Sequence, residues 1–248
     1  MFNNLKNFLL FIGHGRSGSS LLGSLIDAHP NAIISHEYWA VKKWEEGLNR
    51  KQILTGILQN SQRFREKEKG GYNYSIPSQY NGKVKGNLLT IGDKKASRTS
   101  EILAKNEMNI KKFSMDIGLP TKIIHTIRNP YDTISRQILA RPKRKPLSNA
   151  IKIYFLEAKW HRILRGYLKV LSVYSEDFIR DKKETLIKIC KYLELENNTP
   201  NYLEACTKII YASPSRTREK IKWDRKSIDA VKNNIKKYPW LEHYTFED

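Results

Sequence analysis

The chain has 248 residues, of which 40% are hydrophobic and 28% charged, so its composition excludes a disordered or fibrous protein and is typical of one that folds around a core. Its 45 lysines and arginines exceed its 25 aspartates and glutamates by 20, which favours an anionic partner such as nucleic acid, acidic lipid or a phosphorylated small molecule. The only cysteines, Cys190 and Cys206, form neither a CxxC pair nor a metal-ligand cluster, which excludes a disulfide framework and fits a reducing cytosol.

Short β-branched or aliphatic runs alternate along the chain with segments of helical period. The runs predict strands at 7–13, 32–35, 88–92, 122–127 and 171–174. The helical segments are 19–28, 38–48, 51–66, 99–117, 131–140, 148–168, 183–195 and 227–237. This alternation predicts an α/β fold, a single domain over 1–248 with a central parallel sheet flanked by helices. The first apolar run is far shorter than the roughly 20 residues of a membrane-spanning helix, so we expect a cytoplasmic protein without a transmembrane segment.

The segment 13–20, Gly-His-Gly-Arg-Ser-Gly-Ser-Ser, follows a buried-type strand and opens a helix. At such a turn, backbone N–H groups and the helix dipole create an anion site. The spacing imitates the GxxxxGK[ST] loop of nucleoside-triphosphate enzymes, but Ser19 stands where that motif has lysine. The positive charge lies earlier, on Arg16, whose planar guanidinium binds two oxygens of a phosphate or sulfate at once. The segment therefore predicts a P-loop-like, nucleotide-binding architecture without the usual lysine.

The run GRSGSSLLGSLIDAHP resembles the 5′-phosphosulfate-binding loop of sulfotransferases, in the version carried by tyrosylprotein sulfotransferases and many bacterial ones. The resemblance implies an enzyme that uses 3′-phosphoadenosine 5′-phosphosulfate (PAPS) as its co-substrate and releases 3′,5′-adenosine bisphosphate. It also implies that the loop cradles the 5′-phosphate and the sulfonate, through Arg16, Ser17, Gly18, Ser19 and Ser20, with His14 and Gly15 as further contacts.

The segment TKIIHTIRNPYDTISRQILAR predicts a strand, a break at Arg128 and a helix that begins near Pro130. It resembles the family's 3′-phosphate-binding motif, in which an arginine at the strand end and a serine on the following helix hold that phosphate. The resemblance implies this role for Arg128 and Ser135. Many members of the family have the serine eight residues after the arginine, where this chain has Arg136, so Arg136 is the alternative to Ser135.

Two later segments extend the resemblance. The run VLSVYSEDF resembles the family's late strand and the corner after it, which we interpret as scaffold. The basic segment SRTREKIKW resembles the C-terminal loop that covers the donor, and the implied phosphate contacts are Arg216, Arg218 and Lys220.

Sulfuryl transfer to a hydroxyl needs a base near the acceptor, and Glu37 follows a predicted strand at an edge where ligand sites gather. Glu37 lies 21 residues after Arg16, the separation between the loop arginine and the catalytic glutamate of tyrosylprotein sulfotransferases, so the resemblance implies that it is the general base. The other interpretation is a carboxylate that stabilises a helix N-terminus. His36 is the alternative base, because cytosolic sulfotransferases use histidine and its usual pKa suits the task.

The reaction also needs positive charge on the bridging oxygen between phosphate and sulfonate. Lys94 ends the strand-like run LLTIGDK. The family often has a lysine at this strand end, although the neighbouring Lys95 leaves the register ambiguous. We expect such cationic side chains, and no metal, to supply the field.

Two other classes of function stay open at this point. A kinase or other nucleoside-triphosphate enzyme needs the missing loop lysine and an acidic magnesium ligand, for which Asp93 is the candidate at a strand end. A basic nucleic-acid-binding protein explains the charge but predicts a concentrated patch, whereas the lysines and arginines are spread along the chain.

The acceptor is expected to be a hydroxyl of a small molecule or a saccharide, with its identity and the oligomeric state left open. The stretch 38–86 is expected to shape the acceptor pocket, because insertions after early strands vary most among α/β enzymes. Within it, 67–86 reads as a loop, as does ARPKRKP at 140–146. The latter is either a solvated basic turn or a patch that steers an acidic acceptor.

Overall fold

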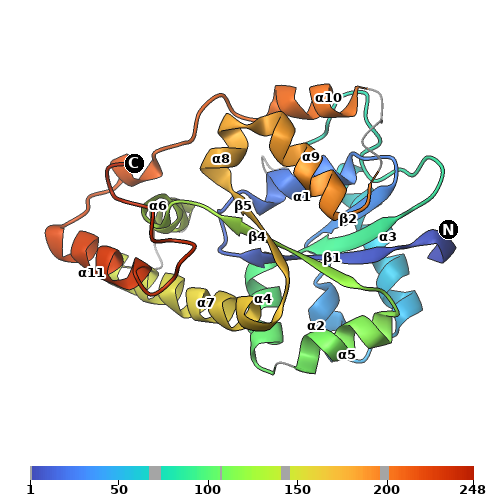
Figure 1. Ribbon diagram of the computed structural model, residues 1–248, viewed down its shortest axis with the longest axis horizontal. Coiled ribbons are helices and arrows are strands. Elements are labelled where there is room, and N and C mark those ends of the chain that lie inside the picture. Colours follow the sequence, from blue (N-terminus) through green and yellow to red (C-terminus); the bar gives the residue numbers. More distant parts are fainter. Residues whose placement is uncertain (1, 67–73, 107, 141–145, 196–200) are drawn as a thin grey trace.

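The computed structural model describes residues 2–66, 74–106, 108–140, 146–195 and 201–248. Its centre is a five-stranded sheet in the order β2-β3-β1-β4-β5, in which every neighbouring pair of strands is parallel (Figure 1). The strands are β1 (Asn7–Gly13), β2 (Ala32–His36), β3 (Thr90–Lys94), β4 (Thr121–Ile127) and β5 (Val170–Tyr174). The predicted α/β fold with a central parallel sheet is therefore confirmed.

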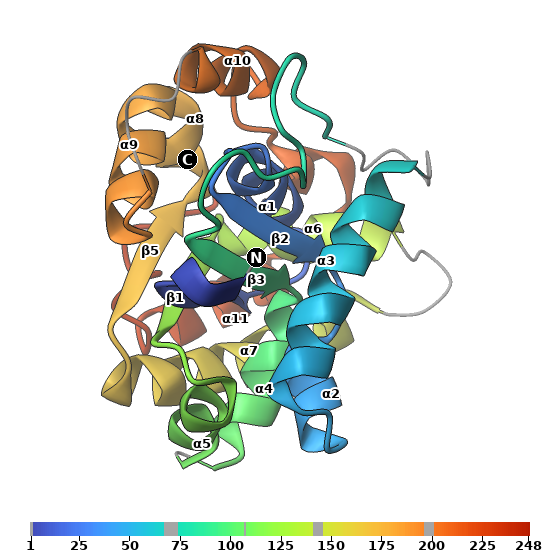
Figure 2. The same cartoon turned by 90° about the vertical axis from the view of Figure 1, so that its right-hand side faces the viewer.

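Helices cover both faces of this sheet (Figures 1 and 2). One face carries α1 (Ser19–Asp27), α8 (Ser175–Arg180), α9 (Lys182–Tyr192) and α10 (Tyr202–Ile209). The other face carries α2 (Ala40–Glu45), α3 (Arg50–Glu66), α4 (Ala96–Ala104), α5 (Met108–Ile117) and the end of α7 (Leu147–Tyr167). The remaining elements are α6 (Pro130–Ala140) and α11 (Arg225–Ile235), which pack with α7, and the short 3-10 helices η1 (Phe2–Asn4) and η2 (Thr217–Lys220).

Strand β1 shows why its sequence is apolar throughout. Leu9 and Phe11 face the core under α1 and α9, while Phe8, Leu10 and Ile12 face the core under α3, α4 and α5. All five side chains are fully buried. A parallel strand covered on both faces reads as a continuous hydrophobic run, and this explains why the strand is easy to find in the sequence.

The carboxyl ends of the strands meet at one edge of the sheet, and the topology makes a crevice there. Strand β1 lies between β3 and β4, so the chain leaves β1 toward one side for β2 and β3 and crosses back to the other side for β4 and β5. Ligands of open α/β sheets bind at such a reversal. The loops that follow β1, β2, β3 and β4 all reach this crevice.

The helix and strand boundaries correct the sequence prediction in several places. Strand β3 runs over Thr90–Lys94 and not 88–92, and the predicted helix 99–117 is two helices, α4 and α5. Asn106 separates them, since its side chain accepts the backbone N–H of Met108 at 2.9 Å and so favours a new helix start. Helices α8 and α10 were not predicted, because they are only 6 and 8 residues long and so show too few turns for a helical period to stand out.

The two predicted loops are described only in part. Residues 74–86 carry no helix or strand, as expected, while 67–73 lie outside the described residues. The basic stretch 141–145 of ARPKRKP also lies outside them. In the described part of the chain, no helix combines the length and the apolar character needed to cross a membrane.

Candidate active site

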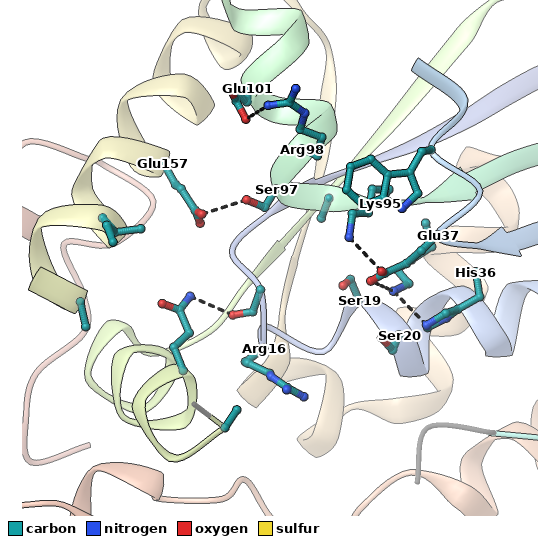
Figure 3. A pocket seen from close by; sticks show the side chains of 18 of the residues that line it. Arg16, Ser19, Ser20, His36, Glu37, Lys95, Ser97, Arg98, Glu101 and Glu157 are labelled. Carbon is teal, nitrogen blue, oxygen red and sulfur yellow. Dashed lines mark hydrogen bonds and ion pairs between the residues drawn. The ribbon is translucent and has the colours of Figure 1, made fainter. Parts of the chain in front are cut away.

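Among the described residues, two cavities open at the carboxyl edge of the sheet and share one wall. The larger has a volume of about 560 Å³ and the smaller about 390 Å³. Arg16, Ser19 and Ser20 line both, so the loop after β1 and the start of α1 stand between the two cavities. Figure 3 shows this loop from the larger cavity, with Glu37 on the same side of the view as Ser19 and Ser20. A group held on the loop is therefore within reach of both sides.

The loop is held in a tight conformation from behind. Gly13 has a φ of +136°, and a Cβ there would lie 2.5 Å from the carbonyl oxygen of Thr126. Ser17 donates its hydroxyl hydrogen bond to the carbonyl of His14 at 2.7 Å and lies 2.8 Å from the hydroxyl of Thr126. Arg16 itself has a φ of +78°, and such backbone strain in a non-glycine residue is concentrated at functional sites.

The N-terminus of α1 faces the junction of the two cavities. Its N-cap is Gly18, which has a φ of +92° and no side chain with which to cap the first turn. The first-turn N–H groups of a helix lack intrahelical partners and carry partial positive charge. Together with Arg16, they make this junction suited to an anion, as the sequence predicts.

His14 is the loop residue that turns away from the cavities. Its ring stacks on Tyr154 at a centroid distance of 3.7 Å, and its Nε2 lies 2.8 Å from the Tyr154 carbonyl. Burial lowers the pKa of His14 to about 4, against the opposing effect of the Tyr154 hydrogen bond. The side chain lines neither cavity, so its geometry is that of a supporting residue and not of a ligand contact.

Arg128, at the end of β4, reaches into the smaller cavity. Its guanidinium donates to the carbonyl of Ser215 at 2.6 Å, to the hydroxyl of Thr217 at 2.9 Å and to the carbonyl of Arg16 at 3.4 Å. Arg128 therefore joins the loop after β1 to the segment that leads into η2. Burial lowers its pKa, while Asp132 and Glu176 oppose this effect.

Ser135 and Arg136 occupy opposite environments on α6. Ser135 is fully buried, and its hydroxyl accepts the indole N–H of Trp223 at 3.1 Å. Arg136 lines the smaller cavity together with Arg128. Of the two residues between which the sequence left a choice, the structure brings Arg136 and not Ser135 to the cavity.

The C-terminal basic residues also differ in whether they reach a cavity. Arg216 pairs with Glu219 at 3.1 Å and donates to the carbonyl of Glu247, and Arg218 is buried with its Nη1 3.4 Å from Asp132. Neither lines a cavity, whereas Lys220 lines the smaller one.

The rest of the smaller cavity is aromatic and apolar. Tyr74 and Tyr211 come from distant parts of the chain, and their hydroxyls lie 3.4 Å apart at its wall. Burial and then Tyr211 raise the pKa of Tyr74 to about 12, and Arg136 and Arg16, which line the same cavity, oppose that rise. Phe178 of α8 completes this part of the wall. The cavity thus combines cations with surfaces on which a planar ring can stack.

Glu37 lies in the larger cavity between two lysines. Its Oε1 is 3.1 Å from Lys94 Nζ and its Oε2 is 2.8 Å from Lys95 Nζ. Partial burial would raise the pKa of Glu37, but Lys94 and Lys95 outweigh it and lower the pKa from 4.5 to about 2. The same Lys94 ammonium lies 3.5 Å from Nε2 of His36. The sequence-predicted acid–base candidates therefore meet at one point, within the cavity that Figure 3 draws.

The turn that carries Glu37 is strained and is held by Asp93, a role that the sequence did not reveal. Glu37 and Trp39 have φ values of +59° and +70°. The fully buried Asp93 accepts the backbone N–H groups of Tyr38 and Ala40 at 2.9 Å each and the hydroxyl of Ser35 at 2.8 Å. Its carboxylate is thus occupied by the protein. Across the described ranges, no group of three or more His, Cys, Asp or Glu residues is arranged to hold a metal ion.

The far wall of the larger cavity is built from paired polar groups. On α4, Arg98 forms an ion pair with Glu101. Ser97, also on α4, donates to Glu157 of α7 at 2.8 Å and so joins the two helices. Apolar surface on α6 and α7 completes the wall through Ile138, Ala140, Ala150 and Ile153. From the stretch 38–86, Trp39 is the described residue that lines this cavity, so α4, α6 and α7 contribute most of its shape.

Comparison with known proteins gives one family and one fold. A model of the sulfotransferase family matches residues 9–199. The sulfotransferase domain of the Synechococcus PCC 7002 olefin synthase is 16% identical, with 93% of this chain and 94% of that domain covered and a TM-score of 0.55. A sulfotransferase from Alicyclobacillus acidocaldarius is 17% identical, with 98% and 97% covered and a TM-score of 0.52. Sulfotransferase STF9 from Mycobacterium avium is 10% identical, with 98% and 78% covered and a TM-score of 0.54. The comparison with curated sequences finds no match.

Proposed function

The chain belongs to the sulfotransferase family, and we propose that it moves a sulfuryl group from PAPS to a hydroxyl of a small molecule or saccharide. The observation that carries the proposal is the meeting of two cavities at the loop after β1, with Arg16, Ser19 and Ser20 on both. A donor in the smaller cavity would present its sulfonate at that junction. An acceptor in the larger cavity would meet it from the other side, which suits an in-line displacement.

The smaller cavity suits the donor's adenosine and its two anionic ends. Tyr74, Tyr211 and Phe178 offer surfaces for the base, and the α1 N-terminus with Arg16 suits the 5′ end. Arg128 and Arg136 both line this cavity and suit the 3′-phosphate, because guanidinium groups bind phosphate through paired, charge-assisted hydrogen bonds. Arg136 takes the role that the family resemblance gave to a serine.

The larger cavity suits the chemistry. Glu37 takes the proton of the acceptor hydroxyl, the hydroxyl oxygen forms a bond to sulfur, and the bond between sulfur and the bridging oxygen breaks to release 3′,5′-adenosine bisphosphate. Lys94 neutralises the charge that develops on the bridging oxygen. The ammonium of Lys94 lies 3.1 Å from Glu37, so the two groups act on neighbouring atoms. His36 stays the alternative base, because it reaches the same ammonium.

The kinase interpretation finds no support at this edge of the sheet. Ser19 stands at the position of the P-loop lysine, and Asp93, the acidic residue placed to hold magnesium, accepts hydrogen bonds from Tyr38, Ala40 and Ser35. A carboxylate that already accepts from two backbone N–H groups and a hydroxyl has little capacity left for a cation.

The polar wall of the larger cavity indicates what the acceptor offers. The Arg98–Glu101 pair places spare N–H donors beside spare carboxylate lone pairs. A hydroxyl both donates and accepts, so a compound with several hydroxyls can use both. This wall therefore favours a polyhydroxylated acceptor over a purely apolar one. Trp39 adds aromatic surface at the cavity wall.

Calorimetric titration tests the donor. Wild-type protein should bind 3′,5′-adenosine bisphosphate and should not bind ATP with magnesium at comparable affinity. Arg16→Ala should weaken the bisphosphate Kd by about tenfold or more, since it removes a charge-assisted contact. Arg216→Ala is the matched control, because Arg216 is exposed and lines neither cavity. Tight binding of ATP with no response to the bisphosphate would overturn the proposal.

A screen with sulfur-labelled donor tests the acceptor. Sugars and glycosides should accept the label more efficiently than phenols or long-chain alcohols of similar size. Faster labelling of the phenols would show that the polar wall does not select the acceptor.

A further inference from the structure

Gly23 lies in the middle of α1, where a glycine needs an explanation. Within a helix, glycine is less favourable than alanine by roughly 0.5–1 kcal/mol, and its φ here is not of the left-handed kind that only glycine adopts freely. Gly23 lines neither cavity. The reason for glycine must therefore lie in what its missing side chain leaves room for.

The space beside Gly23 is filled by the stem of Lys94. A Cβ at position 23 would lie 3.1 Å from Lys94 Cγ, 3.2 Å from Lys94 Cβ and 3.8 Å from Ile34 Cγ2. The two shortest contacts are tighter than ordinary van der Waals contact. Alanine fits at position 23 only if the Lys94 stem or α1 itself moves.

The backbone and the first side-chain carbons of Lys94 have little freedom to move. It is the last residue of β3, which is paired with β1 on one side and β2 on the other. Only 3% of the residue is exposed, so its aliphatic stem is enclosed and its ammonium emerges at the larger cavity. The ammonium ends 3.1 Å from Glu37 Oε1 and 3.5 Å from His36 Nε2. The course of the stem past Gly23 therefore sets where the ammonium arrives.

We infer that Gly23 is a positioning residue for sulfuryl transfer, whose missing side chain forms the channel that directs the Lys94 ammonium to Glu37 and to the bridging oxygen of the donor. The inference rests on the proposed function of Lys94. It assigns Gly23 no contact with donor or acceptor.

The other helical glycines provide contrast. A Cβ at Gly166 of α7 would meet nothing within 4 Å, so that glycine supplies a neutral comparison. A Cβ at Gly56 of α3 would lie 2.0 Å from the Tyr38 hydroxyl oxygen, so Gly56 makes room for the ring next to Glu37. Gly23 differs from both because its neighbour is the stem of a side chain at the reacting centre.

A physical measurement that does not depend on turnover tests the channel first. In Gly23→Ala, displacement of the Lys94 ammonium should raise the pKa of Glu37, which wild type holds at about 2. Carboxyl-carbon NMR of Glu37, followed downward from neutral pH as far as each protein stays folded, should show protonation beginning at least about half a pH unit earlier in the variant. Gly166→Ala should leave the titration unchanged. An unshifted Glu37 in Gly23→Ala would overturn the inference.

A double-mutant cycle then tests the route of the effect. Gly23→Ala should lower kcat about tenfold or more in the presence of Lys94, since small misplacements at a reacting centre are costly. The Lys94→Ala background lacks Cγ, the rest of the stem and the ammonium, and keeps only the 3.2 Å contact to Cβ. There the same change should lower kcat less than about twofold. Equal losses in both backgrounds would show that Gly23 acts through helix packing and not through Lys94. A changed bisphosphate Kd in Gly23→Ala would overturn the inference as well, because the donor loop would then be disturbed.

Failure of the proposed function is recognised separately. If wild type binds no 3′,5′-adenosine bisphosphate, the proposal for the donor fails. The NMR titration still decides whether Gly23 sets the distance between Lys94 and Glu37.

Discussion

Acid should destabilise this protein through three buried histidines behind the loop after β1. The rings of His14 and His161 have centroids 4.7 Å apart, and those of His125 and His161 are 4.8 Å apart. All three are at most 4% exposed. The charged group that faces them is Arg165, whose Nη1 lies 3.3 Å from His125 Nδ1. Burial first, and then Arg165, lowers the pKa of His125 well below the usual value. Burial first, and then His14, His125 and Arg165, lowers the pKa of His161 in the same way.

The direction and size of the effect follow from His14. In the unfolded chain a histidine takes up a proton below a pKa of 6.5, whereas folded His14 stays neutral until pH approaches about 4. The unfolded state then binds more protons, so stability is complete above pH 6.5 and falls as pH falls toward 4. At about pH 5, His14 alone lowers the free energy of unfolding by about 2 kcal/mol, from about 1.5 units at 1.36 kcal/mol each. His125 and His161 act in the same direction.

Urea denaturation at about pH 7.5 and about pH 5 measures this loss. His161→Leu is the informative variant, because neither ring nitrogen of His161 has a hydrogen-bond partner among the described residues. Replacing an unsatisfied buried polar group with an apolar one is close to neutral or stabilising. The variant should therefore keep its stability at neutral pH and lose less than wild type in acid. The exposed His243, changed to Gln, is the control. Equal free energies of unfolding at the two pH values in wild type would refute the reasoning.

Four further substitutions test the site. Glu37→Gln should lower kcat about a hundredfold or more, as loss of a general base does, with an unchanged bisphosphate Kd by calorimetry; normal turnover would move the role to His36. Arg136→Ala should weaken the bisphosphate Kd about tenfold, and Ser135→Ala by less than about twofold; the reverse order would return Ser135 to the donor site. Asp93→Ala should lower the free energy of unfolding by about 3 kcal/mol in urea denaturation, because it leaves three donors without their acceptor; a loss below about 1 kcal/mol would show that the turn is held by other contacts.

The sheet could be predicted from the sequence because its strands read as apolar runs, and all but the half-buried edge strand β5 are largely buried. The prediction was least accurate where function interrupts that pattern. Strand β3 was placed at 88–92, since the apolar residues end before Asp93 and Lys94. The structure continues the strand through both, because polar residues at the carboxyl end of a parallel strand face the site and not the core. A hydrophobic pattern cannot reveal strand residues such as Asp93 and Lys94, whose side chains contact polar groups of the site.

Side-chain direction is the part of the site that the sequence could not supply. Successive residues on a helix point about 100° apart, so a shift of one position turns Ser135 toward Trp223 and leaves Arg136 at the cavity. Asp93 shows the same limit, since its hydrogen bonds to Tyr38 and Ala40 join segments more than 50 residues apart. No local sequence pattern predicts such a contact. The positive φ values of Glu37 and Trp39 depend on it, so the sequence could not predict them either.

The pairing of Glu37 with two lysines bears on how the proposed reaction begins. A carboxylate with a pKa of about 2 is ionised at neutral pH but is a weak base, because proton transfer is most effective when the pKa of the base lies near the working pH. In the proposed reaction the Lys94 ammonium also contacts the bridging oxygen of the donor. An ammonium that turns toward that oxygen leaves Glu37 with Lys95 alone and thereby raises the pKa of the base. The strength of the base is then linked to the presence of the donor, through the same lysine that assists the leaving group.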